Sequence, residues 1–130
     1  MRILAALGVI AALIVPMPAQ AAITGEDLLS RCSASEKSMQ GEKLSPDEAL
    51  DSMWCVGYLS GLLDGFGVAD FKIENEKMVC PAAEGLSRSE ALAIITRYLR
   101  EHPEERAKSG RRDALVALSK ALPCGSNKAR

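Results

Sequence analysis

The chain carries four cysteines, and their spacing constrains its fold more than any other feature of the sequence. The closest two, Cys32 and Cys55, are 23 residues apart, so the chain has no Cys-x-x-Cys redox motif and no closely paired zinc ligands. His102 is the single histidine, and we therefore expect no metal site. In an oxidising compartment, four widely spaced cysteines indicate two structural disulfides.

Residues 1–21 have the pattern of a secretory signal peptide. Arg2 gives a short positive start, the next 13 residues from Ile3 to Val15 are apolar, and Ala19-Gln20-Ala21 offers small residues for cleavage. The apolar run is shorter than the about 20 residues that span a bilayer. We expect cleavage after Ala21, a mature domain of residues 22–130 in the periplasm, and no membrane segment in the mature chain.

The mature chain has the pattern of four helices. The predicted starts have helix-capping residues and the predicted ends have helix breakers. The starts are Thr24, Ser45, Ser87 and a position near Ser109, and the ends are Gly41, Gly65 to Gly67, His102-Pro103 and Pro123. We therefore predict an all-α fold of four helices, arranged as two helical hairpins.

This arrangement chooses among the three ways of pairing four cysteines. A short turn around Gly41 makes the first two helices antiparallel, which brings Cys32 opposite Cys55. The end of the fourth helix returns to the start of the third, which brings Cys124 near Cys80. The predicted disulfides are therefore Cys32–Cys55 and Cys80–Cys124.

Residues 66–86 lack a helical or strand period, and we expect a solvated loop there. Loops of about 20 residues are unusual in small domains and are often functional. The partner-binding hypothesis makes Phe71 an apolar anchor within a set of polar side chains: Asp70, Lys72, Glu74 and Asn75. In the alternative, the segment is a tolerated surface insertion and Phe71 folds back into the core.

Gly57 and Gly61 lie one turn apart in the second predicted helix. Each glycine within a helix costs about 1 kcal/mol relative to alanine, so their repetition indicates close approach of another backbone. We expect a helix of the same chain to pack there, because Trp54 and Tyr58 beside them need burial in the monomer. The alternative is the same helix of a second subunit in a homodimer.

Composition and motifs give no support for catalysis or for nucleic-acid binding. The formal net charge is −1 and aromatic residues make up 4% of the chain, too few for a base-stacking surface with a basic groove. The sequence shows no oriented nucleophile and base and no phosphate-binding glycine loop. His102 precedes a proline at a helix end, where capping or packing is expected. We predict a non-enzymatic protein without a cofactor.

Four segments in order resemble the Rap/Tai family of bacterial immunity proteins. They are the Cys-x-Gly-Tyr-x-x-Gly run from Cys55 to Gly61, Cys80-Pro81, the Tyr-Leu-x-x-His-Pro-Glu run from Tyr98 to Glu104, and the closing Leu122-Pro123-Cys124. The chain departs from the family pattern in two places. Leu122 stands where an aromatic residue is common, and the basic run 109–112 stands where small apolar residues are common.

The resemblance implies an all-helical, often dimeric periplasmic protein that binds and blocks a peptidoglycan amidase toxin delivered by type VI secretion. The expected mechanism is occlusion of the toxin's active site. A second hypothesis is a periplasmic chaperone of the acid-stress kind, or an orphan binding protein with the same fold. An adjacent gene for a secreted amidase favours immunity, whereas acid-induced binding of unfolded clients favours the chaperone.

Overall fold

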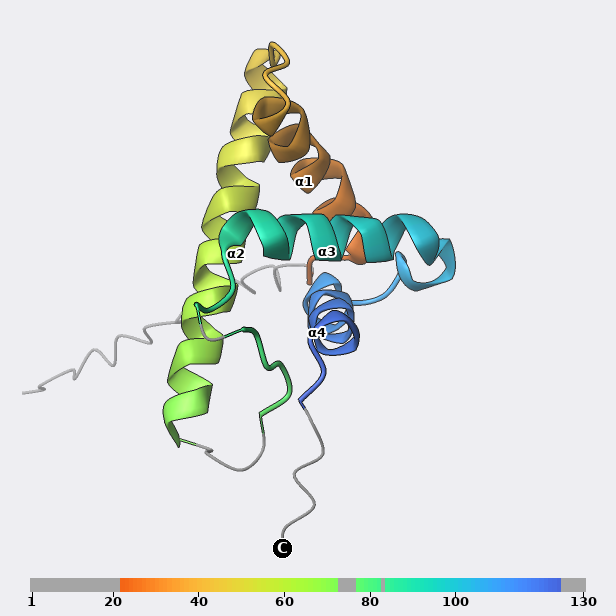
Figure 1. Ribbon diagram of the computed structural model, residues 1–130. Helices are drawn as coiled ribbons and strands as arrows, with labels where there is room; N and C mark the ends of the chain where they lie inside the picture. The colour runs from red at the N-terminus through yellow and green to blue at the C-terminus, as the bar shows by residue number, and fades with distance from the viewer. Residues whose placement is uncertain (1–21, 73–76, 83, 125–130) are drawn as a thin grey trace, which may run out of the picture.

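A computed structural model describes residues 22–72, 77–82 and 84–124 of the chain. Over these residues it contains four α-helices, one 3-10 turn and no strand (Figure 1): α1 (Gly25–Met39), α2 (Pro46–Lys72), α3 (Arg88–Glu101), η1 (Pro103–Glu105) and α4 (Gly110–Ala121). The predicted all-α, four-helix fold is confirmed.

Reciprocal capping boxes fix the starts of α1 and α3. The Asp27 amide donates to Thr24 Oγ1 at 3.1 Å, and the Thr24 amide donates to an Asp27 carboxylate oxygen at 3.0 Å. Ser87 and Glu90 repeat the arrangement at α3. These bonds satisfy amides that have no partner within the helix. The predicted starts at Thr24, Ser87 and Ser109 are confirmed as N-caps.

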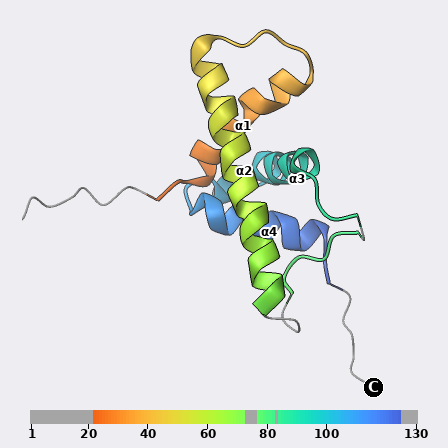
Figure 2. The ribbon, with the colours of Figure 1, turned by 90° about the vertical axis from the view of Figure 1, so that its left-hand side faces the viewer.

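The first two helices form an antiparallel hairpin, and the last two cross its lower half (Figure 1). Gly41 makes the turn between α1 and α2 with a φ of 78°, a conformation that favours glycine. Figure 2 shows α4 running across the view where α3 is seen almost end-on, so α3 and α4 cross steeply. The core lies where all four helices meet.

Both predicted disulfides are present. Cys32–Cys55 joins α1 to α2, and both cysteines are buried in the core. Cys80–Cys124 ties the segment after α2 to the chain just beyond α4. Beside it, the Cys80 amide donates to the Leu122 carbonyl oxygen at 3.0 Å. The segment between α2 and α3 is therefore fixed to the end of α4.

The predicted end of the second helix is wrong. α2 continues past Gly65 and Gly67 to Lys72. Leu62, Leu63 and Phe66 pack against the core along this stretch, and this packing outweighs the weak helix propensity of the glycines. The segment between α2 and α3 is therefore shorter than the predicted loop of residues 66–86.

The predicted packing of another helix of this chain on Gly57 and Gly61 is also wrong. Both glycines are exposed, and a Cβ added at either would meet no atom of the described residues within 4 Å. The buried side of α2 carries Cys55 and Leu59 instead. Trp54, half-buried, stacks on Tyr58 with 5.2 Å between ring centroids, and it needs no helix over the glycines.

Two glycines that the sequence analysis did not single out have closely approaching neighbours. Gly25 begins α1 and Gly110 begins α4, and both are buried where these helix starts meet. The Gly110 amide donates to the Ile23 carbonyl oxygen at 2.8 Å, and the Gly25 amide donates to the Lys108 carbonyl oxygen at 3.0 Å. A Cβ on Gly110 would lie 2.6 Å from the Thr24 carbonyl oxygen, so a larger residue requires a backbone shift.

Candidate partner-binding site

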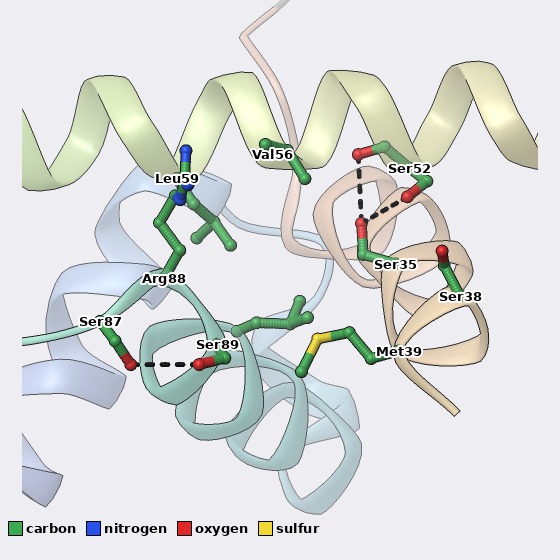
Figure 3. Close-up of a pocket in the computed structure, with 10 residues that line it drawn as sticks. Ser35, Ser38, Met39, Ser52, Val56, Leu59, Ser87, Arg88 and Ser89 are labelled. Carbon is green, nitrogen blue, oxygen red and sulfur yellow. Dashed lines mark hydrogen bonds between the residues drawn. The ribbon is translucent and has the colours of Figure 1, made fainter. Parts of the chain in front are cut away.

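A groove of about 630 Å³ opens at the corner where α3 crosses the α1–α2 hairpin (Figure 3). The C-terminal half of α1, the middle of α2 and the first turns of α3 line it. The lining residues are Ser35, Ser38, Met39, Ser52, Val56, Leu59, Ser87, Arg88, Ser89 and Leu92. This volume is within the range of small-ligand pockets.

The bottom of the groove is apolar, and its edges are hydroxyl groups. Leu59 and Leu92 are buried, whereas Val56 and Met39 have exposed fractions of 44% and 63%. Ser35, buried between the hairpin helices, hydrogen-bonds to the Ser52 carbonyl oxygen and pairs with its hydroxyl, both at 3.1 Å. The groove therefore offers an apolar surface with hydrogen-bonding groups around it.

Arg88 is the one charged residue among the described residues that line the groove. Its guanidinium donates to Ser60 Oγ at 3.2 Å, and Figure 3 shows the side chain reaching toward α2. Across the described part of the chain, Arg88 forms no ion pair. Glu36, on the neighbouring part of α1, pairs with other residues. Its carboxylate accepts a hydrogen bond from Thr96 at 2.5 Å and forms an ion pair with Arg100.

A smaller depression of about 230 Å³ lies between α3 and α4. The His102 ring packs against Tyr98 with 4.4 Å between centroids, and His102 Nδ1 lies 3.0 Å from Glu104 Oε1. The Lys120 ammonium group lies over the Tyr98 ring, with Nζ 5.0 Å from the ring centroid. His102 thus packs against α3, as the sequence analysis expected.

Asp113 is a buried carboxylate that the sequence analysis did not identify. Its Oδ1 accepts a hydrogen bond from Arg112 at 3.1 Å, but Oδ2 has no partner among the described residues. The Tyr58 hydroxyl is likewise buried and unpaired there. Burial raises the pKa of both groups. No sequence signal separates Asp113 from an ordinary first-turn acid of a helix.

The predicted loop residues are only in part described. Asp70, Phe71 and Lys72 lie in the last turn of α2 rather than in a loop, which corrects the predicted conformation. Glu74 and Asn75 lie outside the residues that the structure describes. Further along the chain, Val79 is buried and Cys80 is disulfide-bonded, so both are fixed to the core of the domain.

A family model of Rap1a immunity proteins matches residues 24–124, which include all four helices and both disulfides. The chain belongs to this family. The resemblance drawn from the four sequence segments is thereby confirmed, and the chain is an immunity protein whose expected partner is a toxin. No curated protein and no solved structure matches the chain.

The described residues contain neither a metal-binding cluster nor a membrane-spanning helix. No group of three or more histidine, cysteine, aspartate or glutamate side chains there is placed to hold a metal ion. No helix there combines the length and apolar character needed to cross a membrane.

Proposed function

We propose that this immunity protein acts in the periplasm, where it binds and occludes a peptidoglycan amidase toxin delivered by type VI secretion. The family match over 24–124 is the observation that carries the proposal. The signal-peptide pattern of residues 1–21 and the two disulfides support export to an oxidising space. In this proposal the protein blocks the toxin by contact and does no chemistry of its own.

The C-terminal end of α2 is the element that we propose enters the toxin's active-site cleft. A cleft is filled by a projecting element on a rigid base, and α2 extends beyond α3 at this end of the molecule (Figure 1). Phe66, six residues before the end of α2, packs against the core, and Cys80–Cys124 holds the chain beyond α2. Phe71 is the proposed apolar anchor, since aromatic residues often dominate such interfaces.

Inhibition of a purified toxin tests this function. The mature protein captures a periplasmic binding partner, mass spectrometry identifies it, and hydrolysis of peptidoglycan is measured with and without equimolar immunity protein. We expect the partner to be an amidase and its activity to be lost. An amidase that stays active in the complex, or a partner of another enzyme class, contradicts the proposal.

Two variants test the proposed contact. Phe71→Ala is expected to weaken toxin binding by about 30-fold, equivalent to about 2 kcal/mol. Glu42→Ala, in the exposed turn at the other end of α2, is the matched control and should leave binding unchanged. Equal affinities of the two variants would move the interface away from the end of α2.

The acid-stress chaperone makes the opposite prediction in a simple assay. Such a chaperone suppresses aggregation of an unfolded client at acidic pH and needs no specific toxin. Suppression of client aggregation at acidic pH, together with no amidase binding, would favour that function instead.

A further inference from the structure

The α1–α2–α3 groove combines three features that one type of ligand would use together. Its bottom is apolar, serine hydroxyls border it, and the one charged side chain among its described lining residues is a cation. Leu59 and Asp70 are 11 residues apart in α2, or about 16 Å along the helix axis. The groove is therefore a surface separate from the one proposed to enter the toxin's cleft, and a ligand bound there is additional to that contact.

The apolar surface of the groove is continuous from the core to the outside. Leu92 at the bottom is buried, but Val56 and Met39 above it remain 44% and 63% exposed. Figure 3 shows the Met39 side chain extending toward α3 and Val56 pointing down from α2 into the opening. An aliphatic side chain placed between them would remove this apolar surface from water.

The charge of the groove indicates a carboxylate as the polar part of the ligand. The Arg88 guanidinium donates a hydrogen bond to neutral Ser60 and forms no ion pair in the described part of the chain. Arg88 is also the first residue of α3, where the helix dipole favours a negative charge. Arginine binds carboxylates through paired N–H donors.

The serine hydroxyls distinguish a peptide from a fatty acid, which also joins an apolar chain to a carboxylate. Ser52 and Ser89 border the groove on opposite sides, from α2 and α3 (Figure 3). The Ser52 hydroxyl pairs with that of Ser35, and the Ser89 hydroxyl with that of Ser87. A hydroxyl group both donates and accepts hydrogen bonds, so each can bind an amide group of a peptide in addition to its present partner. An alkyl chain has no group that could use them.

We propose that this groove binds an extended peptide segment of a protein partner, with an aliphatic side chain next to a carboxylate. The aliphatic group lies between Met39 and Val56, and the carboxylate pairs with Arg88. The carboxylate is either the C-terminus of the partner or an acidic side chain beside an aliphatic residue. Arg88 binds a carboxylate in the same way in both.

NMR titration of the isotope-labelled mature chain tests the groove without any toxin. The probe is acetyl-Ala-Leu with a free carboxylate, and the two comparison ligands are the same dipeptide with a C-terminal amide and hexanoate. We expect saturable shifts at Val56, Ser89 and Leu92 with the acid, and at least tenfold weaker binding of the amide and of hexanoate. If the amide binds as tightly as the acid, the carboxylate does not contribute to binding. If hexanoate binds as tightly as the acid, the groove is a site for a fatty acid and not for a peptide. Either result overturns the proposal.

A pair of arginine variants completes the test. Arg88→Gln should weaken binding of the acid at least tenfold and leave binding of the amide unchanged. Arg97→Gln is the matched control, because Arg97 is an exposed arginine of the same helix that lines the other depression. The same affinity in Arg88→Gln as in Arg97→Gln, or shifts outside the groove, would contradict the proposal while leaving toxin inhibition to be judged by its own assay.

Discussion

The Asp113 carboxylate lies against Gly25, so closely that a Cβ added to Gly25 would come within 2.6 Å of Asp113 Oδ2. This contact joins the start of α1 to the first turn of α4, two helices far apart in the sequence. Asp113 is fully buried there, and burial raises the pKa of its carboxyl group. The positive charge of Arg112 and its hydrogen bond to Asp113 offset part of this effect.

Gly25→Ala should destabilise the protein, even though Gly→Ala in a helix is usually favourable. The added methyl group meets Asp113 Oδ2 at 2.6 Å, and the Arg106 Cα and a Leu99 methyl at 3.0 Å. Overpacking of this kind costs about 1–3 kcal/mol, or a melting temperature lower by several degrees. Gly61→Ala is the control because its site is open, and it should be neutral or stabilising by about 1 kcal/mol. Equal melting temperatures of the two variants would show that the α1–α4 contact yields easily.

Glu105 should make stability depend on pH in the acid range. Lys108 and Arg112 hydrogen-bond to its carboxylate and lower its pKa to about 2, from an ordinary value of 4.5. Since the folded protein binds this proton less readily than the unfolded chain, the ion pairs stabilise the fold at neutral pH. That contribution decreases as the pH falls from about 4.5 toward 2.

Denaturant unfolding of Glu105→Gln and wild type across this pH range measures the contribution. The variant is expected to be less stable than wild type at neutral pH and to approach it at about pH 2. Glu101→Gln removes an exposed carboxylate that has no ion pair within the described ranges, and it should follow the wild-type curve. A difference between Glu105→Gln and wild type that is the same at every pH would exclude this cause.

The sequence is sufficient to predict the features that depend on local chemistry. Capping boxes at Thr24 and Ser87 require only residues three apart, and both predicted starts are correct. The disulfide pairing depends on helix order and a short turn at Gly41, and it needs no knowledge of the crossing angles. Capping signals are local and the pairing follows from the order of the helices, so neither requires the packing geometry.

Features that depend on packing are harder to predict from the sequence. Apolar residues occur on both sides of α2, so their spacing alone does not reveal that Met53, 71% exposed, faces outward while Leu59 faces the core. The repeated glycines of α2 suggest close packing, yet the closely packed glycines are the isolated Gly25 and Gly110. The groove has no sequence signature, because its serines and Arg88 come from three helices and have no shared motif.

The two disulfides should differ in their resistance to reduction. Cys32 and Cys55 are 1% and 0% exposed, whereas Cys80 and Cys124 are half-buried. A reductant reaches the second pair without unfolding of the core. Timed alkylation with peptide mapping should therefore show Cys80 and Cys124 modified first. In denaturant the order should disappear, and earlier modification of Cys32 in the native protein would contradict the predicted order.

Loss of the Cys80–Cys124 bond should still be costly. It joins residues 44 positions apart, and the entropy of closing such a loop corresponds to roughly 3–4 kcal/mol of stability. A Cys80→Ser/Cys124→Ser double variant should therefore unfold at much lower denaturant concentration. Wild-type protein that is reduced and alkylated only at these two cysteines lacks the same disulfide without any substitution, and its denaturation midpoint provides an independent comparison. An unchanged midpoint in both would show that the segment after α2 needs no covalent tether.

Gly61→Leu tests the exposed glycine surface of α2, where no residue in the described part of the chain packs on Gly57 or Gly61. Leucine has a higher helix propensity than glycine by about 1 kcal/mol, so the variant should melt at the wild-type temperature or above. Sedimentation then examines the alternative that a second copy packs there. A wild-type dimer that becomes a stable monomer in Gly61→Leu would locate the two-fold interface on this helix, because the leucine side chain keeps the backbones apart. An unchanged sedimentation coefficient excludes that interface, and a large fall in melting temperature at every protein concentration would contradict the exposure of Gly61 itself.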